Sequence, residues 1–295
     1  MPDFIGCRTL EIVDDGLGLT FPLLVLYPTG THGQPESIGP YTLDVALDAP
    51  IEPGSFPLVL ISHGTGGSPL THRLLAHFLA RHGFVVGLPR HHANHRDDNS
   101  WYNTPDNLVA RPRHLSLAID GLFAEFGAAL RPDWVALIGH SLGGYTALAL
   151  AGGQPGSLPH EHSDGTPQPI PVAPDARVRA LVLLAPATVW YRAVGALRNV
   201  QVPILLLMGE KDEWTPEFHA QIVLNGVADR QHITHRIIEN AGHYSFLSPF
   251  PPERVSPTFP PSQDPPGFDR MQFQAEFQVE ILKFLLPQLG QQRAD

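Results

Sequence analysis

The stretch WVALIGHSLGGY, residues 134–145, decides the fold prediction. It joins a short apolar run to a stretch of good helix formers, Tyr145–Leu150, through a turn in which glycines flank a serine. A serine at a strand-to-helix turn of this kind takes a strained backbone conformation that exposes its hydroxyl group, and the glycines remove side chains that would collide there. The pattern therefore predicts that Ser141 is a nucleophile at the end of a buried strand.

Short apolar runs recur on both sides of this stretch and alternate with helical patterns, which is typical of an α/β protein with a doubly wound, mostly parallel sheet. The predicted strands are Leu58–Ser62, Phe84–Leu88, Trp134–Gly139, Arg179–Ala185, Pro203–Met208 and His232–Ile238. Apolar stripes predict helices at residues 71–82 and 113–130 and a closing helix that contains residues 273–285. Alternation of apolar and polar residues around the turn signal at Asp14 predicts an N-terminal antiparallel hairpin over Arg8–Tyr27.

The length and composition indicate one folded unit. The chain has 295 residues, of which 43% are hydrophobic and 16% charged, enough apolar material for a full-sized core. We expect a single α/β domain over residues 1–295, with two excursions rich in proline and glycine at residues 152–178 and 248–268. Proline excludes regular helix and central strand from both excursions. We expect each excursion to be a surface loop. For the second, the alternative is that it forms a wall of an active site.

Charge and cysteine content exclude several classes of function. Lys and Arg number 19 against 29 Asp and Glu, and the formal net charge of −10 disfavours nucleic acid as a partner. The single cysteine, Cys7, allows no intramolecular disulfide. No apolar run is long enough for an export signal or a membrane span, so the sequence predicts a soluble, cytoplasmic protein. Its oligomeric state stays open.

A serine hydroxyl is a poor nucleophile unless a base and an orienting acid activate it. The segment Gly209–Glu213 follows a predicted strand, and we assign Asp212 as the acid, with Glu210 and Glu213 as its rivals. His243 follows the last predicted strand and is assigned as the general base. The order Ser, Asp, His along the chain is the order of the α/β-hydrolase fold.

A glycine-rich loop, Ser62–Ser68, follows the first parallel strand. Acyl transfer requires fixed donors for the oxyanion of its tetrahedral intermediate, and backbone N–H groups of such a loop can supply one. We predict that the amides of Thr65 and Leu142 form the oxyanion hole. His63 is expected to brace the loop rather than to act in catalysis.

Two further groups of residues follow strand ends. The segment Arg90–Asp98 contains potential metal ligands. It lacks a helical His-x-x-x-His context with a general-base Glu, and the serine mechanism needs no metal, so we predict neither metal nor cofactor. It can shape the mouth of the site or form a surface loop.

Aromatic side chains at strand ends can form an apolar substrate pocket. These are Trp101, Tyr102, Trp190, Tyr191, Tyr244 and Phe246.

From about residue 8 to residue 285 the chain resembles the α/β-hydrolase superfamily of serine hydrolases, and within it the branch similar to dienelactone hydrolases and platelet-activating-factor acetylhydrolases. The resemblance lies in the hairpin that ends in Leu26–Thr29, the loop at Ser62, the turn at Ser141 and the tail His243–Leu247. It implies metal-independent ester hydrolysis through an acyl-enzyme, with the roles assigned above. Dienelactone hydrolases themselves use a cysteine nucleophile, whereas this chain has Ser141.

The sequence thus predicts a carboxylic ester hydrolase that acts on a small, uncharged or apolar ester. The alternatives on the same fold are a lactonase, a phospholipid acetylhydrolase and an acyltransferase. A non-catalytic ligand-binding module is a further alternative, although nothing in such a module would require all three residues of a triad.

Overall fold

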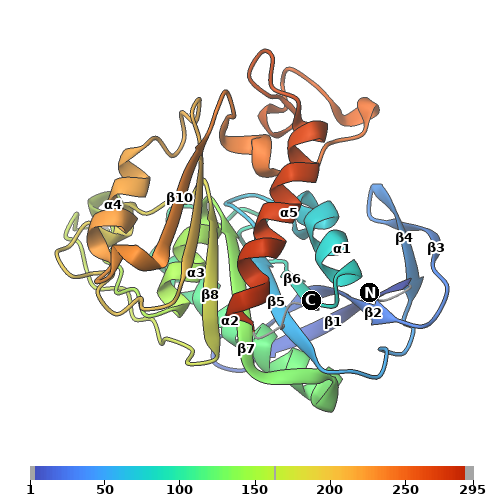
Figure 1. The fold of residues 1–295 in the computed structure, drawn as a ribbon. Coiled ribbons are helices and arrows are strands. Elements are labelled where there is room, and N and C mark those ends of the chain that lie inside the picture. Colours follow the sequence, from blue (N-terminus) through green and yellow to red (C-terminus); the bar gives the residue numbers. More distant parts are fainter. Residues whose placement is uncertain (1–3, 163, 290–295) are drawn as a thin grey trace.

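A ten-stranded sheet forms the centre of the computed structural model, which describes residues 4–162 and 164–289 (Figure 1). Residues at both ends and position 163, inside the first proline-rich excursion, lie outside the described residues. The order across the sheet is β10-β9-β8-β7-β5-β6-β2-β1-β4-β3. The strands are β1 (Phe4–Asp14), β2 (Leu19–Thr29), β3 (Gln34–Ile38), β4 (Tyr41–Leu47), β5 (Phe56–Ser62), β6 (Val85–Pro89), β7 (Leu130–His140), β8 (Val178–Leu184), β9 (Ile204–Gly209) and β10 (Ile233–Ile238).

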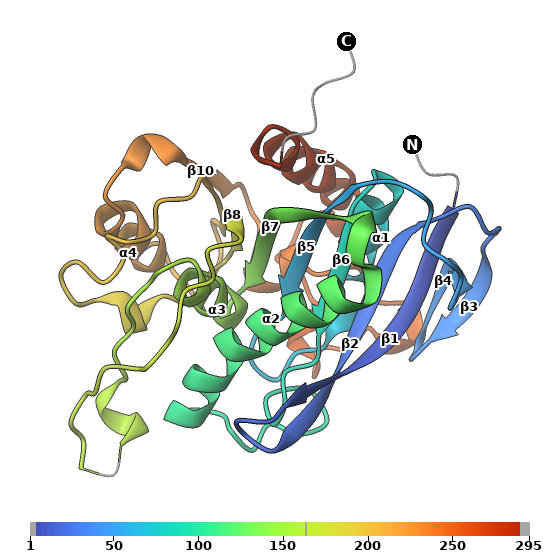
Figure 2. The same ribbon diagram turned by 90° about the horizontal axis from the view of Figure 1, so that it is seen from below.

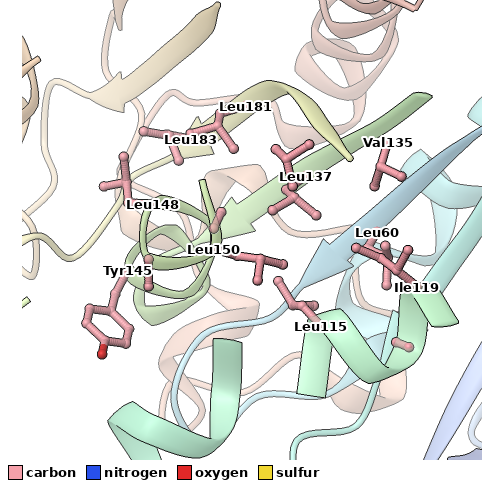
Figure 3. Packing of buried hydrophobic residues seen from close by; sticks show 14 of the residues in the cluster. Leu60, Leu115, Ile119, Val135, Leu137, Tyr145, Leu148, Leu150, Leu181 and Leu183 are labelled. Carbon is pink, nitrogen blue, oxygen red and sulfur yellow. The ribbon is translucent and has the colours of Figure 1, made fainter. Parts of the chain in front are cut away.

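Helices cover both faces of this sheet (Figures 1 and 2). The helices are α1 (Arg73–Arg81), α2 (Pro105–Phe126), α3 (Leu142–Leu150), α4 (Phe218–Gly226) and α5 (Arg270–Gln288). One buried cluster joins α2, α3 and α4 to the sheet, and a second joins α1 and α5 to its other face. Figure 3 shows Leu137 and Leu148 within the first cluster, whereas Ile138, the next residue of the strand, belongs to the second. Both faces are therefore buried, which explains the continuous apolar runs.

The predicted fold class is confirmed. Strands β5 to β10 correspond to the six predicted runs and pair in parallel, and β1 and β2 form the predicted antiparallel hairpin with Leu10 opposite Leu23. The hairpin joins the parallel strands through antiparallel pairing of β2 with β6. No helix within the described residues is both long and apolar enough to cross a lipid bilayer.

The sequence analysis missed a second hairpin, formed by β3 and β4. In β4, Tyr41, Leu43 and Val45 are buried and alternate with exposed residues, so this strand rests one face on the core. The pattern is short and begins next to the turn at Gly39 and Pro40, which weakens its signal. The hairpin matters for function because its tip contributes to the cavity described below.

Helix α2 begins at Pro105, several residues before the predicted start, and contains Pro112. Proline removes a helical hydrogen bond to the carbonyl group four residues earlier, here that of Leu108. The Tyr145 hydroxyl, from α3, donates to this carbonyl oxygen at 2.9 Å. A tertiary contact thus satisfies the acceptor that the proline leaves free, and the helix continues through it.

Candidate active site

Ser141 lies between β7 and α3 with φ +54° and ψ −120°, a conformation that is rare for residues other than glycine. The neighbouring glycines are required by close backbone contacts. A Cβ atom on Gly143 would lie 2.0 Å from the carbonyl oxygen of Ser62, and one on Gly139 would lie 2.2 Å from that of Gly143. The turn is packed directly against the end of β5, so the serine is held in its strained conformation by its surroundings.

Asp212 and His243 follow the adjacent strands β9 and β10 and form a buried pair. The Oδ2 atom of Asp212 lies 2.9 Å from Nδ1 of His243. The other oxygen of Asp212, Oδ1, accepts the backbone N–H groups of Trp214 and Thr215, each at 2.8 Å, and the Thr215 hydroxyl donates to Oδ2 at 2.7 Å. Four donors therefore surround this carboxylate and fix the ring that it contacts.

Burial by itself raises the pKa of Asp212, but hydrogen bonding and attraction by His243, with the donors of Thr215, outweigh it and lower the pKa to about 2. Asp212 is therefore ionised at any pH above about 4, as an orienting acid must be. Its rivals are placed differently: Glu210 is exposed and accepts the backbone N–H of Asn240 at 2.8 Å, and Glu213 is exposed.

Ser141 and His243 line one cavity of about 1030 Å³. No hydrogen bond joins the Ser141 hydroxyl to the imidazole within the described residues; in unliganded sites such bonds are often long and form fully only with substrate. His140, next to the serine, contacts the predicted base: its Nε2 lies 2.9 Å from the carbonyl oxygen of His243, and the two rings are 4.8 Å apart.

Two peptide groups beside Ser141 are fixed by hydrogen bonds to their carbonyl oxygens. The carbonyl oxygen of Gly64 accepts hydrogen bonds from the Gly67 amide at 3.1 Å and from Nδ1 of His63 at 2.7 Å. That of Ser141 accepts the amides of Gly144 at 2.9 Å and Ala187 at 2.8 Å. In a trans peptide the N–H points opposite to the C=O, so these contacts fix the directions of the N–H groups of Thr65 and Leu142. The first turn of α3 leaves the Leu142 amide without a helical acceptor.

The cavity is built from segments far apart in the sequence. Its lining residues include the tip of the β3–β4 hairpin, residues of the second proline-rich excursion, residues after β8 and β9, and a residue of α4. None of its lining residues comes from the described part of residues 152–178. Apolar or aromatic side chains in the lining include Ile38, Tyr41, Leu70, Val189, Trp190, Trp214, His219, Leu247, Phe250, Phe259 and Pro261.

Of the six predicted pocket aromatics, Trp190 and Tyr244 line the cavity and four do not. Trp101 packs edge-on against His92, and Tyr102 is exposed at the surface. Tyr191 and Phe246 are core residues: Tyr191 donates to the carbonyl oxygen of Tyr145 at 2.8 Å, and Phe246 packs against two phenylalanines of α5. Proximity to a strand end did not reveal which way these rings turn.

The sequence analysis also missed residues that support the site. Four residues form hydrogen bonds with the predicted triad or with the loops that carry the site: Asn94, Arg111, His140 and Thr215. Thr215 could have been found, because a threonine three residues after an aspartate often bonds back to it. Arg111 gives no such signal, since it is one of several charged residues in a helix.

We expect Asp212→Asn to lower kcat of ester hydrolysis about 10⁴-fold, because an amide in this position favours the wrong tautomer of His243. Thermal stability should fall much less than activity, since the substitution conserves shape. Glu213→Gln, one residue further along the same loop, is the matched control and should leave kcat unchanged. Equal losses in both variants would count against Asp212 as the orienting acid.

Comparisons with known proteins address the fold of the chain. A family model described as chlorophyllase matches residues 33–160. A dienelactone hydrolase-like promiscuous phosphotriesterase from metagenomic libraries has 16% identity and a TM-score of 0.63, over 97% of this chain and 100% of that chain. A ferulic acid esterase from Streptomyces cinnamoneus has 18% identity and a TM-score of 0.68, over 98% of this chain and 92% of that chain. Among curated proteins, none matches this sequence. The chain thus has the α/β-hydrolase fold, and the resemblance predicted from the sequence is confirmed at the level of the fold.

Proposed function

We propose that the protein is a carboxylic ester hydrolase that acts through Ser141, His243 and Asp212. The observation that supports this most is the presence of a strained serine and an aspartate-bound imidazole on one cavity, beside two peptide groups with fixed orientation. Each feature alone has an ordinary structural explanation. Together they supply the nucleophile, base, acid and anion donors of acyl transfer.

The proposed reaction has two halves. The Ser141 oxygen attacks the ester carbonyl carbon while His243 Nε2 takes the hydroxyl proton, and the amides of Thr65 and Leu142 receive the oxyanion. The C–O bond to the alcohol then breaks, and the imidazolium returns the proton to the departing oxygen. Water, deprotonated by the same imidazole, attacks the acyl-enzyme; the acid is released and Ser141 regains its proton. Asp212 stabilises the imidazolium in both halves.

Aromatic and aliphatic side chains dominate the lining, which favours an ester with apolar groups on both sides of the carbonyl. The cavity is large enough for more than a short-chain ester. Its lining also includes Arg90, Arg96 and Arg254, of which Arg90 forms an ion pair with Asp97 at 2.8 Å. An ester panel should therefore pair each neutral ester with an analogue that has a carboxylate.

The direct test uses purified protein, a fluorophosphonate probe and this panel. We expect one covalent label per chain, on Ser141 by peptide mapping, and hydrolysis of p-nitrophenyl esters that the probe abolishes. Added alcohol should give little transester if water is the usual acceptor, whereas dominant transester would indicate an acyltransferase. A protein that stays unlabelled and inactive on all esters would be the non-catalytic module.

Phe259→Ala tests whether the second proline-rich excursion binds substrate. The ring lines the cavity and packs edge-on against Phe250 at 5.3 Å between centroids, so its removal enlarges one side. We expect KM for aryl or long-chain esters to rise about 10-fold and KM for acetate esters to change little, as measured by initial rates. Met271→Ala, which removes an exposed side chain just after this excursion, is the control. If KM did not depend on ester size, this wall would not bind substrate.

A further inference from the structure

A fully buried arginine lies beneath the loop that bears the Thr65 amide. Arg111 belongs to α2, and none of its surface is exposed to solvent. It is not among the residues that line the cavity, so it does not contact the substrate. Such a position is unusual, because a charged group without solvent requires compensation by the protein.

The guanidinium group joins three parts of the site through hydrogen bonds. It donates to the carbonyl oxygen of His63 and, at 3.2 Å, to the hydroxyl of Ser62, both at the start of the glycine-rich loop. It donates at 2.6 Å to Oδ1 of Asn94, whose amide in turn donates to the Thr65 hydroxyl at 2.9 Å. Its Nε donates at 3.0 Å to the hydroxyl of Thr146, on α3 one turn after Leu142.

All these acceptors are neutral. No carboxylate forms an ion pair with Arg111 within the described residues. Burial lowers the pKa of Arg111 to about 9, and the nearby Tyr145 opposes the shift only in part. The group therefore keeps its proton at neutral pH, and its positive charge is not cancelled by a neighbouring anion.

Packing alone does not explain this arrangement. An apolar side chain of similar length would fill the volume without the desolvation cost, and a paired arginine would recover part of that cost. A buried charge without a neighbouring anion does have an energetic use where negative charge appears during a reaction, because a fixed charge in a region of low dielectric acts strongly and needs no reorganisation.

We infer that Arg111 is a positioning residue for the oxyanion hole: it fixes the loop of Thr65 relative to the first turn of α3 and places a positive charge behind the two amides. The inference rests on the proposed ester hydrolysis. It assigns to Arg111 an effect on the transition state and none on binding of the neutral substrate.

Arg111→Met removes the charge and all donors while keeping most of the volume. We expect kcat for a p-nitrophenyl ester to fall about 50-fold and KM to stay within about 2-fold, since the loss of one oxyanion donor lowers kcat about 10²–10³-fold. Arg111→Lys keeps the charge but not the fork of donors, so its kcat should lie between those of Arg111→Met and the unmodified protein. The matched control is Arg113→Met, two residues further along α2, whose side chain is partly exposed and pairs with Asp14 at 2.7 Å; it should retain kcat.

A second readout separates positioning from general structural damage. An alkyl boronic acid forms a tetrahedral adduct with a nucleophilic serine and so resembles the intermediate, whereas the product alcohol resembles the ground state. In Arg111→Met, affinity for the boronic acid should fall by about the same factor as kcat/KM, and affinity for the alcohol should not change. Asn94→Ala, which cuts the link to Thr65, should reproduce a weaker form of this pattern.

Three results would overturn the inference: unchanged kcat in a folded Arg111→Met protein, a loss confined to KM, or equal losses of affinity for boronic acid and alcohol. If Arg111→Met does not fold, Arg111→Lys and Asn94→Ala decide on the same readouts. Failure of the proposed function itself looks different, because the unmodified protein would then neither hydrolyse esters nor bind the boronic acid at Ser141.

Discussion

Replacing Ser141 with alanine should lower kcat of ester hydrolysis about 10⁶-fold, the loss typical of removing the nucleophile from a serine triad. The acyl-enzyme cannot form without the hydroxyl oxygen, so only slow attack by water in the oxyanion hole remains. Alanine should not disturb the fold, because it meets the same cost as serine at φ +54° and introduces no new atoms. Initial rates with a p-nitrophenyl ester and a thermal melt measure the two quantities.

Ser68→Ala is the matched control for this variant. Ser68 lines the same cavity, but its hydroxyl caps the short helical turn before α1 by accepting the Leu70 amide at 3.3 Å. This control should keep its activity and its fluorophosphonate label, whereas Ser141→Ala should lose both. Activity within about 10-fold of the unmodified protein in Ser141→Ala would refute the proposed mechanism.

The second large effect is a loss of stability in weak acid. Six buried histidines have lowered pKa values, in each case chiefly because burial disfavours the charged ring. The pKa of His72 falls to about 4, that of His114 to about 3 and that of His219 to about 4. The other three are His63, His91 and His140.

The sign follows from proton linkage. An unfolded histidine, with a pKa of about 6.5, binds a proton at pH 5.5, whereas these folded ones do not, so a fall in pH stabilises the unfolded state relative to the folded state. Below about pH 6.5, each of these histidines lowers the free energy of unfolding by about 1 kcal/mol per pH unit, and the six together lower it by about 6 kcal/mol per pH unit. Because domains of this kind have about 5–15 kcal/mol of stability, we expect unfolding between about pH 6 and pH 5. Carboxylates with lowered pKa values, such as Asp212, also stabilise the folded protein, but that contribution is lost only below about pH 4.

Urea denaturation at several pH values measures this slope. His72→Phe sharpens the test, because neither ring nitrogen of His72 has a hydrogen-bond partner among the residues that the structure describes, and the residue is buried against His140. The variant should reduce the slope by about 1 kcal/mol per pH unit. The exposed His232, changed to glutamine, should leave the slope unchanged. Stability that stays constant from pH 7 to pH 5 would contradict the linkage.

Prediction from the sequence succeeded where a short stretch has its own structural signature. The six parallel strands were found because strands buried on both faces are continuously apolar. The position of Ser141 at a strand-to-helix turn was found because such a turn requires glycines around the serine. Prediction failed for β3 and β4, whose pattern is short, and for the start of α2, because the apolar stripe that predicted this helix begins only at Leu115. A proline inside a helix is tolerated here only because Tyr145, distant in the sequence, replaces the missing donor.

By itself, the sequence determined the fold class, the alternation of the six parallel strands with helices and the candidate residues Ser141, Asp212 and His243, because each depends on a short stretch with its own chemical signature. Only the tertiary structure decided which aromatic rings face the cavity, that the second proline-rich excursion forms one of its walls, and that Arg111 lies beneath the loop of Thr65. These features depend on side chains from separate segments meeting in space. The orientation and burial of these side chains follow from the packing of the whole chain, so no local sequence pattern predicts them.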